Sequence, residues 1–126
     1  TVTDLGPLFE ALEWHPRLGV CLDTCHIFVA DYDIRNEESF LKTFSEFDRL
    51  VGFDRLKVVH CNDSKKGLGS KVDRHEHIGE GEIGARAFEL LVNDPRMMEI
   101  PILLETPDAD THHAQNLARL WAMAKP

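Results

Sequence analysis

The chain has 126 residues, 43% of them hydrophobic, and a formal net charge of −8, because 22 acidic residues outnumber 14 Lys and Arg. This length allows one domain with a modest core, and the sequence has neither an apolar run near the roughly 20 residues of a bilayer-spanning helix nor a signal peptide. We therefore expect a single cytoplasmic domain, residues 1–126, without a membrane anchor. The net negative charge argues against a protein that binds polyanions in general, unless its basic residues and bound metal ions are concentrated in one cleft.

The first half of the chain predicts a helix, a strand and a second helix. The segment TDLGPLFEALEW has helical spacing, with an apolar face that consists of Leu5, Leu8, Phe9 and Leu12. LGVCLDTCH predicts a buried strand from Leu18 to about Asp23. The next helix has Asn36 as its N-cap, followed by two acidic residues in the first turn. Its apolar stripe consists of Phe40, Phe44, Phe47 and Val51.

The second half repeats this alternation. RLKVVHCND predicts a buried strand from Leu56 to about Cys61, and IPILLET predicts a third. Between them, GARAFELLVNDP predicts a helix whose apolar face consists of Ala85, Phe88, Leu91 and Val92. The last helix begins near Asp110, and we expect it to bury Ala114, Leu117, Ala118 and Trp121. Helices that alternate with buried strands indicate an α/β fold with a parallel sheet of about three strands.

Each predicted strand ends in a side chain that can bind a cation, namely Asp23, His60 and Glu105. The carboxyl ends of parallel strands form the edge at which α/β proteins bind ligands. Alternation along a strand places Cys21 on the face of Asp23, and it places Val58 and Leu56 on the face of His60. A consistent arrangement points all three residues into one central space, although a single polar residue at a strand end is more often a cap than a ligand.

Further donor residues lie in the loops that leave these strands. His26 follows Asp23 by three residues, and Asp73 precedes His75 by two. Imidazole and carboxylate donors together suit zinc, manganese or iron better than calcium or an all-thiolate zinc site. Zinc is the metal that this donor set favours most.

The three cysteines permit a rival interpretation, a structural zinc centre made of Cys21, Cys25, His60 and Cys61. No C-x-x-C pair is present, and neighbours in a strand point to opposite faces, so we expect Cys21 and Cys61 to be small buried residues instead. Three other histidines, His15, His112 and His113, are expected to be surface residues without a convergent metal partner.

Three segments carry a resemblance to a known family: GVCLDTCHIFVADYDIR, HCNDSKKGLGSKVDRHEHIGEGEIG and PILLETP. In this order and spacing they resemble the signatures of the endonuclease IV group of abasic-site DNA endonucleases, and the match runs nearly end to end. The resemblance implies a (β/α)8 TIM barrel that carries three zinc ions at the carboxyl ends of its strands. It also implies cleavage of the phosphodiester 5′ of a lost base.

Carried over residue by residue, the resemblance makes His26, Asp73 and His75 the complete protein ligand set of one zinc. It implies that a second zinc is bound by catalytic ligands, which are Asp23, His60 and Glu105. The family completes this second site with a bridging glutamate from an earlier strand, and the remaining zinc ligands also come from earlier strands. Neither is present in this sequence.

A basic loop lies between His60 and His75, and it contains Lys65, Lys66, Lys71 and Arg74. These residues are expected to contact DNA phosphates, although a solvated loop would have the same composition. We also expect Asn62 and Asp63 to orient the ligand histidines.

The length sets a limit on the resemblance, because a complete barrel takes about 250 residues and three strands cannot close one. We therefore expect the C-terminal half of a barrel, inactive alone, with an exposed inner sheet face that the missing N-terminal half or another chain would cover. Two alternatives stay open: a metal-dependent sugar isomerase or epimerase of the xylose-isomerase-like barrels, and a non-catalytic metal-binding half-barrel.

Overall fold

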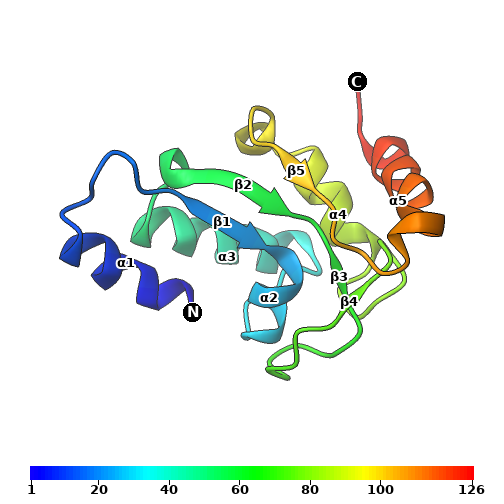
Figure 1. Ribbon diagram of the computed structural model, residues 1–126, viewed down its shortest axis with the longest axis horizontal. Coiled ribbons are helices and arrows are strands. Elements are labelled where there is room, and N and C mark those ends of the chain that lie inside the picture. Colours follow the sequence, from blue (N-terminus) through cyan, green and yellow to red (C-terminus); the bar gives the residue numbers. More distant parts are fainter.

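The computed structural model describes residues 1–126 and contains a parallel sheet of three strands in the order β1–β2–β5 (Figure 1). The strands are β1 (Val20–Asp23), β2 (Leu56–His60) and β5 (Ile102–Leu103). The predicted α/β class and the number of parallel strands are therefore confirmed. No helix is both long and apolar enough to cross a membrane.

Four longer helices match the predicted ones: α1 (Val2–Ala11), α3 (Glu37–Leu50), α4 (Ala85–Val92) and α5 (Ala109–Met123). Two 3-10 turns, Phe53–Arg55 and Pro95–Met97, precede β2 and β5. The sequence pattern missed three short elements, which are α2 (Thr24–Val29) and the antiparallel pair β3 (Asp63–Ser64) and β4 (His75–Glu76). All three of these elements lie at the carboxyl end of the sheet, next to the predicted ligands.

Helix α3 forms where its capping and periodicity predict it. The Asn36 side chain accepts a hydrogen bond from the Ser39 backbone N–H at 2.9 Å, which satisfies an amide that the helix itself leaves free. Its apolar stripe is buried under the sheet, and it consists of Phe40, Phe44, Phe47 and Val51. The predicted core face of this helix is confirmed.

The outer face of the sheet is the one that faces the helices. Val20 and Leu22 of β1 and Val59 of β2 are buried, and in Figure 1 α3 and α4 lie behind the strands. The pairing of β1 with β2 is irregular: Val20 pairs with Leu56, but Cys21 pairs with Val58, so the register skips one residue. The expectation that Leu56 shares the inner face with His60 is therefore wrong, and Leu56 is 3% exposed.

The inner face of the sheet has no covering element, and no helix crosses in front of β1 and β2 in Figure 1. Leu103 is 51% exposed on this face. Cys21 is also exposed, so the expectation that it is a small buried residue is wrong, whereas Cys61 on the outer face is buried as expected.

The last helix buries a different face from the predicted one. In α5 the buried residues are Asn116 and Leu120, whereas the expected stripe is exposed, namely Ala114, Leu117, Ala118 and Trp121. Trp121 is 78% exposed. The helix packs against α4, and no part of the chain lies on its other side, so the apolar stripe has no partner. The predicted buried faces of α1 and α4 are also partly wrong. Leu8 and Leu12, on the predicted face of α1, are exposed, and so is Ala85 on that of α4.

A buried aspartate organises the loop between β4 and α4. The Asp63 carboxylate is fully buried. It accepts hydrogen bonds of 2.7 to 3.3 Å from five backbone N–H groups, those of Ser64, Gly79, Gly81, Ile83 and Gly84. Gly81 lies so close to this carboxylate that a Cβ atom there would overlap with it. Asp63 therefore holds the glycine-rich loop and contacts no ligand histidine, contrary to expectation.

Candidate metal centre

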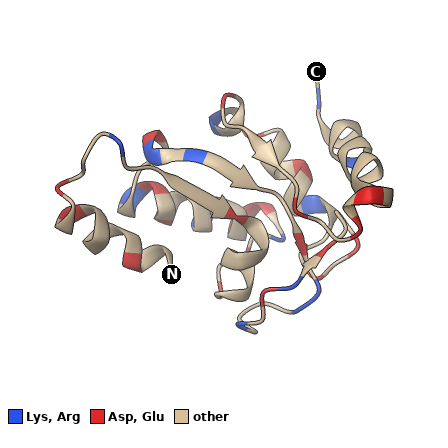
Figure 2. Ribbon diagram, viewed as in Figure 1, with Lys and Arg blue, Asp and Glu red and all other residues tan.

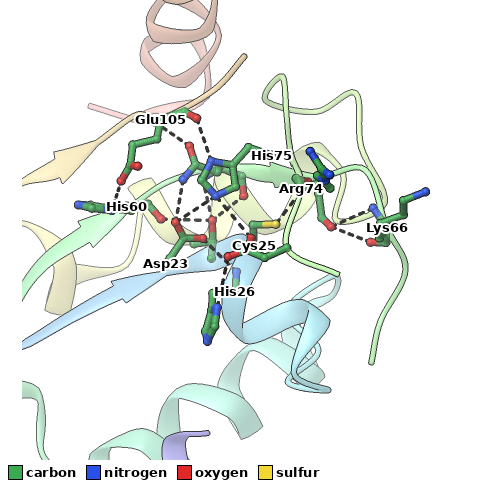
Figure 3. A network of polar contacts seen from close by, with 12 residues as sticks. Asp23, Cys25, His26, His60, Lys66, Arg74, His75 and Glu105 are labelled. Atoms are coloured by element: carbon green, nitrogen blue, oxygen red, sulfur yellow. Dashed lines mark hydrogen bonds and ion pairs between the residues drawn. The ribbon is translucent and has the colours of Figure 1, made fainter. Parts of the chain in front are cut away.

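The three strand-end residues meet at the carboxyl edge of the sheet (Figure 3). Asp23 ends β1, His60 ends β2, and Glu105 follows β5 by two residues. One donor atom from each lies within 4.8 Å of the others, and His60 Nδ1 contacts the Glu105 carboxylate directly. This places one imidazole and two carboxylates around a common point.

A second group of donors comes from α2 and from the segment that leads into β4. His26 Nδ1 lies 3.3 Å from one oxygen of Asp73, and His75 Nε2 lies 3.5 Å from the other. The donor atoms of Asp23, Cys25, Asp73 and His75 converge within 4.8 Å, and His26 joins this group through Asp73. The structure thus brings together residues that are 47 positions apart in the chain.

Asp23 connects the two groups into one continuous site. Its Oδ1 caps α2 by accepting the His26 backbone N–H at 3.0 Å, and its Oδ2 lies 3.4 Å from His75 Nε2. The helix begins directly after the strand because Asp23 is both the last strand residue and the N-cap. The same carboxylate therefore faces both groups of donors.

The orientation of His75 makes it suitable as a metal ligand. Its Nδ1 lies 2.8 Å from the Glu105 backbone carbonyl oxygen, which can only accept a hydrogen bond. The proton shared with this carbonyl therefore lies on Nδ1, and Nε2 is the ring nitrogen that faces the Asp23 and Asp73 carboxylates. A carbonyl that fixes the tautomer in this way is a common arrangement behind metal-binding histidines.

A hydrogen bond from the buried Cys25 thiol fixes the segment that carries Asp73 and His75. Cys25 is fully buried, and burial raises its pKa to about 12, so the thiol is protonated. It donates to the Arg74 carbonyl oxygen at 3.5 Å. Although burial alone would raise the pKa of Asp73, the neighbouring Cys25 thiol and the hydrogen bond with His26 hold it below its ordinary value. Asp73 is therefore an anion in the geometry described.

Two of the four basic residues line the site. Lys65 and Arg74 border an open pocket of about 470 Å³ together with Asp73, His75, Glu105 and Pro107. The Lys65 N–H donates to the Arg74 carbonyl oxygen at 2.9 Å, so the β3–β4 pair holds the two residues side by side. Lys66 and Lys71 do not border the pocket. Figure 2 shows basic residues along this loop and acidic residues at the strand ends, while Lys66 points away from the site in Figure 3.

The cysteine alternative is not supported by the geometry. Cys61 lies on the buried outer face and Cys21 on the exposed inner face, so the thiols do not converge with His60. Zinc fits the observed donors, because it accepts imidazole nitrogens and carboxylate oxygens and needs only three or four of them. Asp23, His60 and Glu105 supply one such set. Asp73 and His75 converge with Asp23 and Cys25 in the other group, which His26 contacts only through Asp73.

One histidine cluster was missed from the sequence. The rings of His77 and His112 stack with centroids 4.7 Å apart, and His77 Nε2 lies 3.7 Å from an Asp108 carboxylate oxygen. The Asn116 amide group lies 3.1 Å from His77 Nδ1. Its oxygen accepts the Ile78 N–H, so its NH2 faces Nδ1.

A donor facing Nδ1 puts the His77 proton on Nε2, where it points at Asp108. The cluster therefore attaches the loop after β4 to α5. Because His77 Nε2 carries a hydrogen in this arrangement, it has no lone pair with which to bind a cation. The i, i+4 spacing of Asp108 and His112 was the available sequence signal, but it does not show that His77 lies beside them.

Comparison with known proteins gives matches over nearly the whole chain. Residues 1–123 match the family described as xylose isomerase-like TIM barrel. A probable endonuclease 4 of Chloroflexus aggregans is 54% identical over 123 residues, which are 96% of this chain and 43% of that protein. A probable endonuclease 4 of Geotalea daltonii is 51% identical over 132 residues, with 98% of this chain and 46% of that protein covered.

The crystal structure of endonuclease IV from Thermus thermophilus is also similar, with a TM-score of 0.77 and 42% sequence identity. The match covers 91% of this chain and 43% of that one. The chain thus spans less than half the length of the relatives it matches. Its three strands and covering helices correspond to part of a TIM barrel.

Proposed function

This chain belongs to the xylose isomerase-like TIM barrel family, in its endonuclease IV group, and on that premise we propose that it is part of a zinc-dependent abasic-site DNA endonuclease. The proposed enzyme acts in the base excision repair of DNA in the cytoplasm and hydrolyses the phosphodiester 5′ to the lesion. The observation that carries this proposal is the convergence of Asp23, His60 and Glu105 with Asp73 and His75 at one sheet edge.

Two sets of residues would hold the metal ions. Asp23, His60 and Glu105 form one set. His26, Asp73 and His75 would form the other, in which Asp73 lies beside both histidines. Bound zinc supplies Lewis acidity toward the phosphate and lowers the pKa of water from 15.7 to about 7. The carboxylates keep the site anionic, and the His75 contact with the Glu105 carbonyl keeps Nε2 directed toward the Asp23 and Asp73 carboxylates, where it would bind the metal.

The basic residues of the loop would bind the DNA backbone. Lys65 and Arg74 border the pocket beside the ligands, where they can contact the phosphates that flank the cleaved bond. Lys66 and Lys71 lie farther out and would reach phosphates along the same strand. Because the chain has a net charge of −8, this loop and the bound cations confine DNA binding to one edge.

The activity requires more of the barrel than this chain contains. The inner face of the sheet is uncovered, with Leu103 51% exposed, and the chain corresponds to only 43% of the Chloroflexus aggregans relative. We expect the remaining strands of a barrel, or another chain, to cover this face and to add further ligands. The chain alone should therefore bind zinc without cleaving DNA.

The test is reconstitution of incision. The chain is combined with the part of the Chloroflexus aggregans relative that it does not span, and a duplex with one abasic site is assayed with zinc and after chelation. We expect zinc-dependent cleavage 5′ to the lesion, and a loss of roughly 100-fold or more in Glu105→Gln, which keeps the side-chain volume but removes the charge. Glu99→Gln, an exposed position outside the site, is the control.

Two results would contradict the proposal. Zinc binding by the reconstituted barrel without incision would favour a non-catalytic metal-binding module. Interconversion of aldose and ketose sugars without incision would favour a sugar isomerase of the same barrel family.

A further inference from the structure

A single buried amide lies between the ends of all three strands. Asn62 follows β2 and is fully buried. Its Nδ2 donates to Asp23 Oδ2 at 3.0 Å, at the end of β1, and its Oδ1 accepts the Glu105 backbone N–H at 2.7 Å, just after β5. One side chain therefore connects the carboxylate of one predicted ligand to the main chain of another.

The main chain of Asn62 is fixed as well. Its N–H donates to Thr24 Oγ1 at 2.8 Å, and the same hydroxyl donates to the Asn62 carbonyl oxygen at 2.6 Å. Thr24 is fully buried in the first turn of α2. The amide is thus anchored to β1 and α2 before its side chain reaches the ligands.

The amide has only one acceptable orientation. A flip of the side chain would turn the NH2 group toward the Glu105 N–H and the oxygen toward the Asp23 carboxylate, which would replace two hydrogen bonds by two repulsions. The second Asp23 oxygen is held by the His26 N–H at 3.0 Å. Both oxygens of Asp23 are therefore directed by donors, and each keeps a free lone pair.

We propose that Asn62 is a positioning residue of the metal centre: it holds the Asp23 carboxylate and the Glu105 main chain at the separation at which both ligands and His60 can bind one cation. A neutral amide suits this role, because it orients an anion without adding a charge that competes for it. This inference rests on the proposed metal centre, and the expected contact of Asn62 with the ligand histidines is replaced by contacts with the carboxylate ligands.

The chain contains a matched control. Asn116 is 1% exposed, its Oδ1 also accepts a backbone N–H, that of Ile78 at 2.9 Å, and its Nδ2 also has buried partners. Asn116 contacts none of the six predicted ligands. Substitutions at the two asparagines remove the same buried group, but only those at Asn62 remove it from the metal centre.

The experiment is a titration of the 126-residue chain with Co²⁺, followed by calorimetry and by the visible absorption of the bound ion. We expect Asn62→Ala and Asn62→Asp to weaken Co²⁺ binding by roughly 10- to 100-fold and to change the absorption spectrum. Asn62→Asp keeps the acceptor for the Glu105 N–H, so hydrogen exchange at that amide should stay slow in this variant and become fast in Asn62→Ala. Asn116→Ala should change Co²⁺ affinity less than about twofold, because it lies outside the ligand shell.

The outcomes separate this inference from the proposed function. If the unsubstituted chain binds no Co²⁺, the metal centre is wrong and the positioning role is wrong with it. If the chain binds Co²⁺ and the two Asn62 variants bind it equally well, the positioning role alone is overturned. An equal loss of affinity in Asn116→Ala would also overturn it, because a general loss of stability would then explain both effects.

Discussion

Asp63 shows how one charged residue can be buried without a cationic partner. Five backbone N–H groups donate hydrogen bonds to its carboxylate, and the positive ends of these peptide dipoles stabilise the negative charge in place of a cation. Because four of these N–H groups belong to the loop that follows His75 and His77, the position of Asp63 also fixes how the chain leaves the metal centre. An exposed aspartate could not organise a loop in this way, since water would compete for every donor.

Replacement of Asp63 by asparagine tests this role. The new side chain would turn an NH2 group toward N–H donors, so we expect the free energy of unfolding to fall by about 1–3 kcal/mol in Asp63→Asn. Urea denaturation measures the change. Asp54→Asn is the control, because Asp54 is exposed and should change stability by less than about 0.5 kcal/mol. Equal stability of the two variants would show that the loop does not depend on the carboxylate.

The predicted ligands illustrate what residue types and spacing indicate. Asp23, His60 and Glu105 could be selected because they end three apolar runs, and strand ends meet at one edge of a parallel sheet. His77 could not be selected, because its partners His112 and Asp108 come from a helix that begins about 30 residues later. Asn62 was expected to support the ligands, but its position after a strand did not show that its amide contacts the Asp23 carboxylate and the Glu105 main chain and not the histidines.

At the scale of elements, α3 is the helix most completely determined by local chemistry. Asn36 and Ser39 form reciprocal hydrogen bonds at its start, between side chain and backbone in both directions. Its aromatic stripe then packs under the sheet, where Phe40 and Phe44 lie 4.6 Å apart between ring centroids. The capping and the periodicity of this helix agree with its tertiary environment.

Removal of the cap should destabilise the chain without changing the metal centre. We expect Asn36→Ala to lower the free energy of unfolding by about 1 kcal/mol, because the Ser39 N–H loses its acceptor. Thermal unfolding followed by circular dichroism measures this loss. Ser45→Ala, an exposed position in the same helix, should have little effect, and a comparable loss there would contradict the capping explanation.

Helix α5 shows the limit of periodicity. An apolar stripe identifies a face that could be buried, but the neighbouring elements decide whether it is. The stripe that ends in Trp121 has no neighbour in this chain. The opposite side packs on α4 and the loop after β4, where Asn116 finds a partner for its amide oxygen and its amide nitrogen. The prediction therefore identified the helix correctly and its buried face incorrectly.

At the scale of the whole molecule, the main feature is a sheet covered on one side only. Buried residues such as Val20, Leu22 and Val59 face the helices, while Leu103 and Cys21 lie on the uncovered inner face. β1 also forms an edge of the sheet with no strand beyond it. An exposed apolar sheet face next to an unpaired edge favours association with another chain.

Self-association should therefore depend on the inner face. We expect the chain to form concentration-dependent oligomers in sedimentation velocity, and Leu103→Lys to shift it toward the monomer, because a charge on this face opposes burial. Leu41→Lys is a close control, since Leu41 on α3 is 50% exposed and Leu103 is 51% exposed. If both variants associate as the unsubstituted chain does, the sheet face is not the contact surface.

The sequence by itself determined the order of the four longer helices and the three parallel strands, the cap of α3 and the strand ends that carry donors, because periodicity, capping and chain direction are local properties. Only the tertiary structure decided which face of α5 is buried, that the register skips Lys57, and that Asn62 and His77 have partners. These features depend on contacts between segments some 30 to 40 residues apart. The local sequence pattern does not encode such contacts, because whether a given side chain is exposed or buried depends on which other segments the fold places beside it.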